Sequence, residues 1–176
     1  ARYGAAMAQN LMIAGRDLGV TPYGTEALGV MRIEKGHVAG PELNGTTTAD
    51  DLGLGKMMSK KKDFIGRVMA GREALTAPDR QVVVGIKPLD QKRRLRSGAH
   101  VVPKGAIPGP ETDQGYVTSV CYSPMLEQWI GLGLVERGRE RFGEVVRIHD
   151  PLRSEDYEAE ICNPVFYDPE GARQRG

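Results

Sequence analysis

The stretch Thr76-Ala77-Pro78-Asp79-Arg80-Gln81-Val82-Val83-Val84-Gly85-Ile86-Lys87 divides the chain into two parts of different character. Its first part interrupts any helix, because proline lacks a backbone N–H and fixes φ, and we place a domain boundary there. Its second part is a run of β-branched residues that predicts a strand. We therefore expect two domains, residues 1–78 and residues 79–176.

Further strand candidates follow this run, at residues 115–120, 130–134, 144–149 and 156–161. In the last of them Tyr157, Ala159 and Ile161 alternate with acidic residues, which is typical of a half-buried strand. Gly131 and Gly133 alternate with apolar residues, which indicates a strand whose other face is closely approached. Short strands separated by Gly/Pro turns predict a small antiparallel barrel or sandwich.

The part of the chain before the boundary combines helical, strand and extended patterns. Apolar residues at helical spacing predict a helix that ends at Gly19; they are Tyr3, Met7, Leu11, Ala14 and Leu18. We expect a strand over residues 27–34, an extended connection over 36–51 and a short amphipathic helix over 68–75. The predicted fold class is thus α+β, with an α+β part followed by a small antiparallel β-barrel.

Composition limits the classes of function. The chain has 176 residues and a formal charge of +1, so overall charge gives no reason to expect nucleic acid as a partner. No apolar run approaches the length of a membrane span. The two cysteines, Cys121 and Cys162, predict free thiols in a reducing cytoplasm, with one disulfide as the alternative. The chain begins at Ala1, without an initiator Met and in a helical pattern, from which we expect a processed product or a piece of a longer protein.

The glycine-rich stretch from Gly24 to Leu43 carries several ionisable side chains, of which we single out Arg32, Glu34, His37 and Glu42. The middle of this stretch is apolar, and a charged pair on an apolar strand usually needs a partner or a ligand. The alternative is an ion pair between Arg32 and Glu34 that only supports the fold.

Outside this stretch, the sequence gives only weak indications of a catalytic, nucleotide-binding or metal-binding site. The chain has no G-x-G-x-x-G, Walker, G-x-S-x-G or H-E-x-x-H motif, and its three histidines lack metal-ligand spacing. The basic run at residues 91–96 is interpreted first as a solvated loop, with a carboxylate-binding role suggested by its charge alone. The single tryptophan, Trp129, is expected in a core or an interface.

Several motifs resemble the glycine-cleavage T-protein (aminomethyltransferase) family in the order expected for it. The resembling segments are Met31-Arg32-Ile33-Glu34-Lys35-Gly36, Gly40-Pro41-Glu42-Leu43, Lys62-Asp63-Phe64-Ile65-Gly66-Arg67, Gly115-Tyr116-Val117-Thr118-Ser119 with Tyr122-Ser123-Pro124, and Asn163-Pro164-Val165-Phe166-Tyr167. Within that family, Tyr23–Leu28 and Glu34–His37 look most similar to α subunits of heterotetrameric sarcosine oxidases.

The resemblance implies the later part of a folate-binding α+β domain, followed by the family's C-terminal barrel. It implies tetrahydrofolate as the bound cofactor, with flavins and NAD elsewhere in the complex, and other sarcosine oxidase subunits as partners. The implied function is capture of the one-carbon unit of oxidised sarcosine as methylenetetrahydrofolate. The alternatives are a structural or subunit-docking module of the same complex, or an aminomethyltransferase of the glycine cleavage system.

The resemblance makes His37, Glu34, Arg32 and Glu42 the candidates for binding folate, with no catalytic residue and no metal site. His37 stands where the family often has a tyrosine near the folate, and Leu28 stands where it has an arginine that contacts the folate. The family's principal pterin-binding carboxylates lie upstream of Ala1. The isolated piece is accordingly expected to be inactive.

Overall fold

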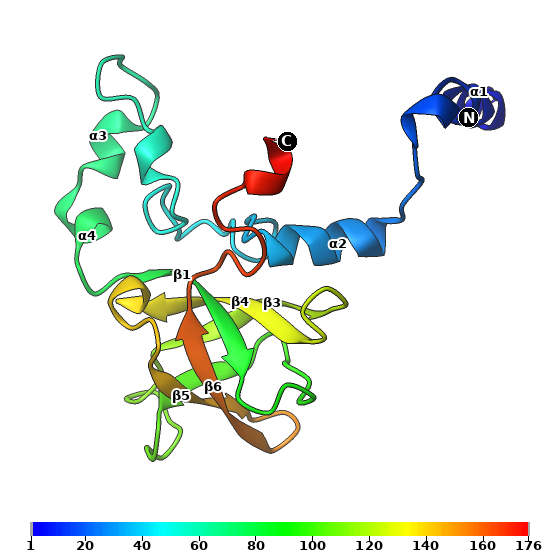
Figure 1. Cartoon of the computed structure of the whole chain (residues 1–176). Helices are drawn as coiled ribbons and strands as arrows, with labels where there is room; N and C mark the ends of the chain where they lie inside the picture. Colours follow the sequence, from blue (N-terminus) through cyan, green and yellow to red (C-terminus); the bar gives the residue numbers. More distant parts are fainter. Residues whose placement is uncertain (1, 176) are drawn as a thin grey trace.

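A computed structural model describes residues 2–175, and its centre is a closed antiparallel β-barrel (Figure 1). Its strands are β1 (Gln81–Pro88), β2 (His100–Pro103), β3 (Gly115–Ser123), β4 (Gln128–Glu136), β5 (Val145–Asp150) and β6 (Glu155–Cys162). Around the barrel the order is β1-β4-β3-β2-β5-β6, so the first and last strands pair and close it. Of the predicted barrel or sandwich, the barrel is confirmed.

The barrel interior is filled by aliphatic side chains from all six strands. They include Val84, Ile86, Val101, Val117, Val135, Val146, Ile148, Ala159 and Ile161. Alternation along each strand directs these residues inward and their neighbours to the outer wall. The five predicted strands all form, and β2 was missed because it has only four residues and ends in Pro103.

Helix α2 (Thr25–Glu34) replaces the strand predicted over residues 27–34, and that prediction is wrong. The apolar residues of this stretch also fit a helical period, and the chain between Thr25 and Glu34 contains no proline. Only Ile33 and Glu34 are buried, at the end of the helix that meets the barrel. Figure 1 shows α2 lying over strands β3 and β4, and it packs there against the outer face of these two strands.

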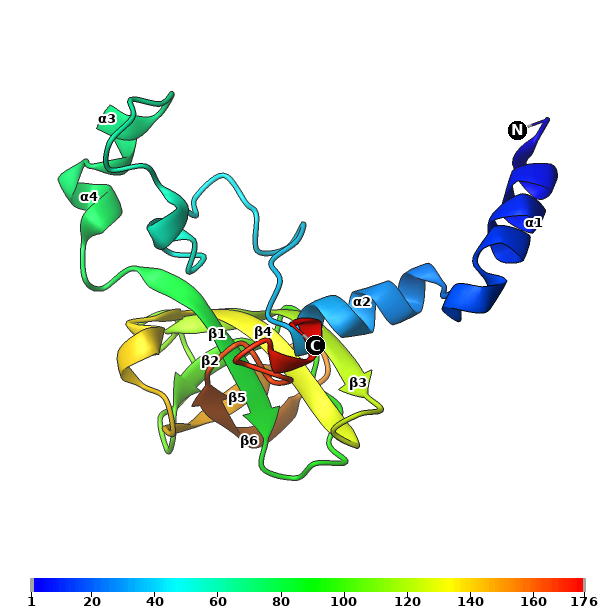
Figure 2. The same ribbon diagram turned by 45° about the horizontal axis from the view of Figure 1, so that its top comes forward.

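Helix α1 (Gly4–Ala14) is shorter than predicted. It gives way at Gly15 to a 3₁₀ turn, η1 (Arg16–Leu18), and Gly19 then adopts φ +69° as the predicted terminating residue. No residue of α1 is buried, and Figure 2 shows the helix standing away from the barrel. Among residues 2–175, none of the helices has the length and apolar character that crossing a membrane requires.

Residues 44–78 form an arm that extends from the barrel beside β1 (Figure 1). It contains η2 (Gly55–Met57), α3 (Arg67–Ala70) and α4 (Glu73–Thr76). The single helix predicted over 68–75 is therefore wrong, because the chain leaves helical structure between α3 and α4 at Gly71. The arm ends where the domain boundary was placed; the division into two domains itself stays a prediction.

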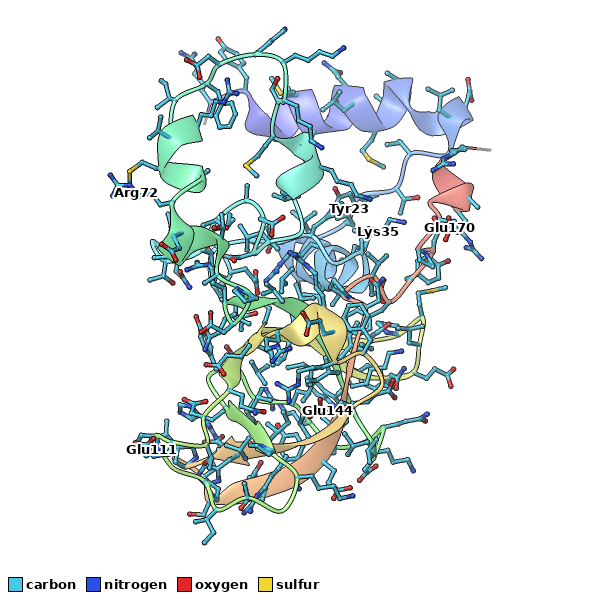
Figure 3. The ribbon with its side chains drawn as sticks, turned by 90° about the vertical axis from the view of Figure 1, so that its left-hand side faces the viewer. Tyr23, Lys35, Arg72, Glu111, Glu144 and Glu170 are labelled. Atoms are coloured by element: carbon cyan, nitrogen blue, oxygen red, sulfur yellow. The ribbon has the colours of Figure 1, made fainter. Side chains whose placement is uncertain are left out.

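The remaining elements are η3 (Gly138–Glu140), between β4 and β5, and η4 (Ala172–Gln174) near the end of the chain. The tail after β6 returns to α2. In Figure 3, Lys35 lies close to Glu170, and the Lys35 ammonium pairs with Asp168 at 3.4 Å. Cys121 and Cys162 are both free, as expected, and the reducing compartment stays a prediction. Burial raises the pKa of Cys121 to about 12, so this thiol is unreactive.

Candidate functional site

The predicted site residues gather where α2 ends against the barrel. Arg32, in the last turn of α2, donates from Nη1 to Glu42 Oε2 at 3.1 Å and from Nη2 to Ser119 Oγ at 2.7 Å. Its guanidinium therefore joins the helix, the connection that follows it and strand β3. An arginine fork suits this task because it offers several donors in one plane.

Glu42 is fully buried, and its carboxylate accepts hydrogen bonds from Arg32 and from three further groups. Thr118 Oγ1 and Ser119 Oγ each donate to Oε1 at 2.5 Å, and the Ala39 N–H donates to Oε2 at 2.8 Å. Burial alone would raise the pKa of Glu42, but these hydrogen bonds and the charge of Arg32 outweigh it and lower the pKa. We call Arg32, Glu42, Thr118 and Ser119 the buried clasp.

A bulge in β3 makes the buried clasp possible. Successive residues of a regular strand point to opposite faces, so Thr118 and Ser119 would not be expected to reach one carboxylate. The pairing of β3 with β4 shifts register between Val117 and Ser119. A bulge re-aims side chains in this way, and here two adjacent hydroxyls meet Glu42 Oε1.

Glu34 makes a second attachment between α2 and the barrel. Its Oε1 accepts a hydrogen bond from Ser123 Oγ at 2.5 Å, and its backbone carbonyl accepts from the N–H groups of Phe166 and Tyr167. Arg32 pairs with Glu42, so the interpretation of an Arg32–Glu34 ion pair is wrong. A helix places residues two apart on different faces, which explains the correction.

His37 is the predicted site residue with an exposed side chain. Its backbone N–H donates to the Arg32 carbonyl at 2.8 Å, which fixes the chain beside the end of α2. Gly36 permits this turn with φ +69°, and a Cβ there would lie 2.6 Å from the Pro164 carbonyl oxygen. Leu28 lies on α2 one turn before Arg32 and is 51% exposed.

The structure thus brings Arg32 and Glu42 into contact, sets Glu34 beside them and leaves His37 at the surface. The partners Thr118, Ser119 and Ser123 were not singled out as site residues, although they fall inside the quoted family motifs. Their role follows from the bulge and from the approach of α2 to β3, which no local pattern encodes. Contact of any of these residues with folate stays a prediction.

The basic run at residues 91–96 lies against the barrel. Arg93 pairs with Glu155 at 3.3 Å, and Arg94 lies over the ring of Trp129 at 5.2 Å from its centroid. Trp129 also meets Tyr122 edge to face, with ring centroids 6.0 Å apart. The arginines of this run therefore have partners within the chain.

Two family models match the chain. The glycine cleavage T-protein C-terminal barrel domain matches residues 81–168, and the GCVT N-terminal domain matches residues 1–62. Among solved structures, the chain is similar to the glycine cleavage system aminomethyltransferase T of Bartonella henselae. The TM-score is 0.76 at 23% identity, over 94% of this chain and 44% of that one. This likeness confirms the fold.

Curated relatives fall in two groups. The sarcosine oxidase subunit alpha of Rhizobium meliloti (strain 1021) is 51% identical over 174 residues, which is 98% of this chain and 18% of that protein. The corresponding subunit of Corynebacterium sp. (strain P-1) is 37% identical over 177 residues, again 18% of its length. The aminomethyltransferase of Thermosipho melanesiensis is 32% identical over 152 residues, 86% of this chain and 39% of the relative.

The chain therefore spans less than half the length of each of these relatives. The N-terminal model matches ahead of the barrel model along the chain, which is the order that the motifs predicted. The C-terminal barrel model covers all six strands of the barrel. The chain belongs to the glycine cleavage T-protein family, with the C-terminal barrel domain of that family as its larger part.

Proposed function

We propose that the chain is the C-terminal part of the folate-binding region of a sarcosine oxidase α subunit. The observation that carries this proposal is the 51% identity to such a subunit over 98% of the chain, against 32% for an aminomethyltransferase. In the assembled enzyme the region would capture the one-carbon unit of oxidised sarcosine as methylenetetrahydrofolate. Flavins and NAD would be held elsewhere in the complex.

The geometry around α2 suggests how the four candidate residues would share this task. Glu42 and Glu34 are buried and already hydrogen-bonded, so they would hold α2 in position. Arg32 keeps some exposed surface and His37 is exposed beside it, so these two offer donors to a ligand. An imidazole can stack on a pterin ring and hydrogen-bond to it.

Bound tetrahydrofolate would supply the nucleophilic nitrogens of the reaction. The chain would supply binding and orientation, and holding an acceptor beside a released one-carbon unit raises its effective concentration. A sarcosine oxidase complex of this kind would give the chain its other partners, the remaining subunits.

The test is a calorimetric titration of tetrahydrofolate into the full-length α subunit that contains this chain. We expect His37→Ala to weaken binding, and His149→Ala, a matched change on the barrel wall, to leave it unchanged. The yield of methylenetetrahydrofolate from sarcosine should fall with the His37 variant at limiting folate. Equal affinities in both variants would remove His37 from the folate site, and absence of folate binding by the wild-type subunit would overturn the proposal.

A second candidate function, docking of another subunit, is favoured by the β3–β4 hairpin. Tyr122 and Met125 are exposed there, beside the stacked Trp129 and Arg94. Tryptophan, tyrosine and arginine are the residues most enriched at binding hot spots. In co-expressed subunits, Trp129→Ala should reduce co-elution of the complex, whereas Leu152→Ala, at an exposed apolar residue elsewhere, should not. An intact complex with Trp129→Ala would exclude this docking surface.

A further inference from the structure

Two histidines stand side by side on the outer wall of the barrel. His100 on β2 pairs directly across the strands with His149 on β5. The same row continues to Tyr116 on one side and to Asp156 on the other. Residues directly opposite each other on antiparallel strands share a face, with Cβ atoms about 4.5–5.5 Å apart. The sequence gives no hint of this pairing, because the two residues lie far apart along the chain.

Each imidazole is oriented by a carboxylate. His100 Nδ1 lies 2.9 Å from Asp113 Oδ2, and His149 Nδ1 lies 2.9 Å from Asp156 Oδ1. The carboxylates are held in turn, since the Gly115 N–H donates to Asp113 Oδ1 at 3.1 Å and Arg147 Nε donates to Asp156 Oδ1 at 2.8 Å. The two ring orientations are therefore fixed by a surrounding set of hydrogen bonds.

These contacts also determine the tautomer. An ionised carboxylate only accepts hydrogen bonds, so Nδ1 of each histidine carries the proton. In a neutral ring the lone pair is then on Nε2, and within residues 2–175 no hydrogen bond reaches either Nε2. A histidine whose Nδ1–H is bound to a carboxylate and whose Nε2 is free has the arrangement of metal-ligating histidines in proteins.

The two rings line a cavity of about 350 Å³. Its other walls come from Val102, Asp113, Pro151 and the loop Pro108-Gly109-Pro110. The side chains of His100 and His149 keep 43% and 23% of their surface exposed, so an ion has access to them. Most of this lining is apolar, and the oxygens of Asp113 are already bonded to His100 and to the Gly115 N–H, so the Nε2 atoms of the two imidazoles are the donors available to an ion.

We propose that His100 and His149 bind a divalent transition-metal ion of the zinc type through their Nε2 atoms. Imidazole nitrogen is a preferred ligand of zinc, nickel and copper ions, whereas magnesium and calcium prefer oxygen. Within residues 2–175 no group of three or more metal-ligating side chains occurs, so two protein nitrogens bind the ion. Water or a donor atom from outside the chain fills the remaining positions of its coordination shell.

This site is separate from the buried clasp and does not depend on the proposed folate function. The test is a calorimetric titration of Zn²⁺ alone into the full chain, without folate, repeated with Mg²⁺. We expect one saturable site for Zn²⁺ and none for Mg²⁺. His100→Asn and His149→Asn should each abolish the site, and the matched change His37→Asn, at the third histidine of the chain, should leave it intact.

The carboxylates provide a second measurement. Asp113→Asn keeps both ligands and should weaken Zn²⁺ binding by about tenfold or more, the usual effect of losing such a supporting group. In chain labelled with ¹⁵N at histidine, Zn²⁺ should shift the Nε2 resonances of His100 and His149 and leave those of His37 unchanged. Zn²⁺ binding that persists in the His100→Asn, His149→Asn double variant would overturn the proposal, as would a wild-type chain that binds no Zn²⁺. Unchanged melting temperatures of the variants would show that they remain folded.

Discussion

Glu42 is a charged side chain with no exposed surface, and it is stable there because the chain supplies four donors to it. An ionised carboxylate in an apolar interior is costly unless it is paired and hydrogen-bonded. The buried clasp meets both conditions, since Arg32 supplies the charge and three other groups supply hydrogen bonds. Glu42 therefore links Arg32 of α2 to the two hydroxyls of β3.

Replacing this carboxylate should destabilise the chain. We expect Glu42→Gln to lower the free energy of unfolding by about 2–4 kcal/mol, because the amide NH₂ cannot accept from Arg32 or from a hydroxyl. Urea denaturation followed by circular dichroism measures the effect. The control is Glu111→Gln, at an exposed side chain near the end of the barrel remote from α1 (Figure 3). A loss in Glu42→Gln no larger than in this control would contradict the prediction.

Glu42 also makes the free energy of unfolding depend on pH. The pKa of Glu42 in the folded chain is below its ordinary value of 4.5, so as pH falls the unfolded state takes up this proton first. The stability that Glu42 contributes is complete above pH 4.5 and is lost as pH falls through the lowered pKa. We expect the free energy of unfolding to decline below pH 4.5, and less steeply in Glu42→Gln than in the wild type. Parallel declines in the two proteins would show that Glu42 is not responsible.

At the scale of elements, Arg80 joins both ends of the arm of residues 44–78, and the Val83 N–H and Arg139 also bond to its Asp51 and Asp50. Arg80 donates from Nη2 and Nε to buried Asp51, and from Nη2 to the Thr46 carbonyl at 2.8 Å. Its Nη1 also reaches the Ala74 carbonyl at 3.3 Å. One guanidinium thus binds both the beginning and the end of the arm just before β1 starts.

Removing that guanidinium should loosen the base of the arm. In Arg80→Ala we expect faster amide hydrogen exchange at Leu52 and Leu54, whose N–H groups bond to carbonyls of this segment, with little change in β3 and β4. Arg72→Ala is the matched control, because Figure 3 shows that side chain at the edge of the arm. Exchange at Leu52 and Leu54 that is equal in the two variants would show that other contacts fix the arm.

The elements also show what the sequence could predict. Strands with clear alternation, such as residues 156–161, were predicted because burial of one face repeats every second residue. Helix α2 was misassigned because its apolar residues fit both periods, and Leu28 and Met31 stay largely exposed. The motifs located Arg32, Glu34 and Glu42, but the partners of these residues depend on a bulge in β3 and on long-range packing. A local pattern contains neither.

At the scale of the whole molecule, close approach of backbones around the barrel depends on glycine. A Cβ on Gly131 would lie 2.8 Å from the Ser119 carbonyl oxygen and 3.0 Å from Leu95 Cδ1. We expect Gly131→Ala to destabilise the barrel by about 1–3 kcal/mol, because β3 would have to move away from β4. Gly45→Ala, with open space around its Cβ, is the control in thermal unfolding. A melting temperature of Gly131→Ala equal to that of the control would contradict this.

Closure of the barrel by β1 and β6 has a consequence for synthesis of the chain. One edge of β1 pairs with β4, but its other edge pairs with β6, the last strand to be made. A ribosome adds about 5–20 residues per second, so the second edge of β1 stays unpaired for several seconds until β6 has been synthesised. An open strand edge is a template for a strand of another molecule. Nascent chains on neighbouring ribosomes are therefore most prone to pair strand to strand during this interval. The risk ends when β6 pairs with β1 and closes the barrel.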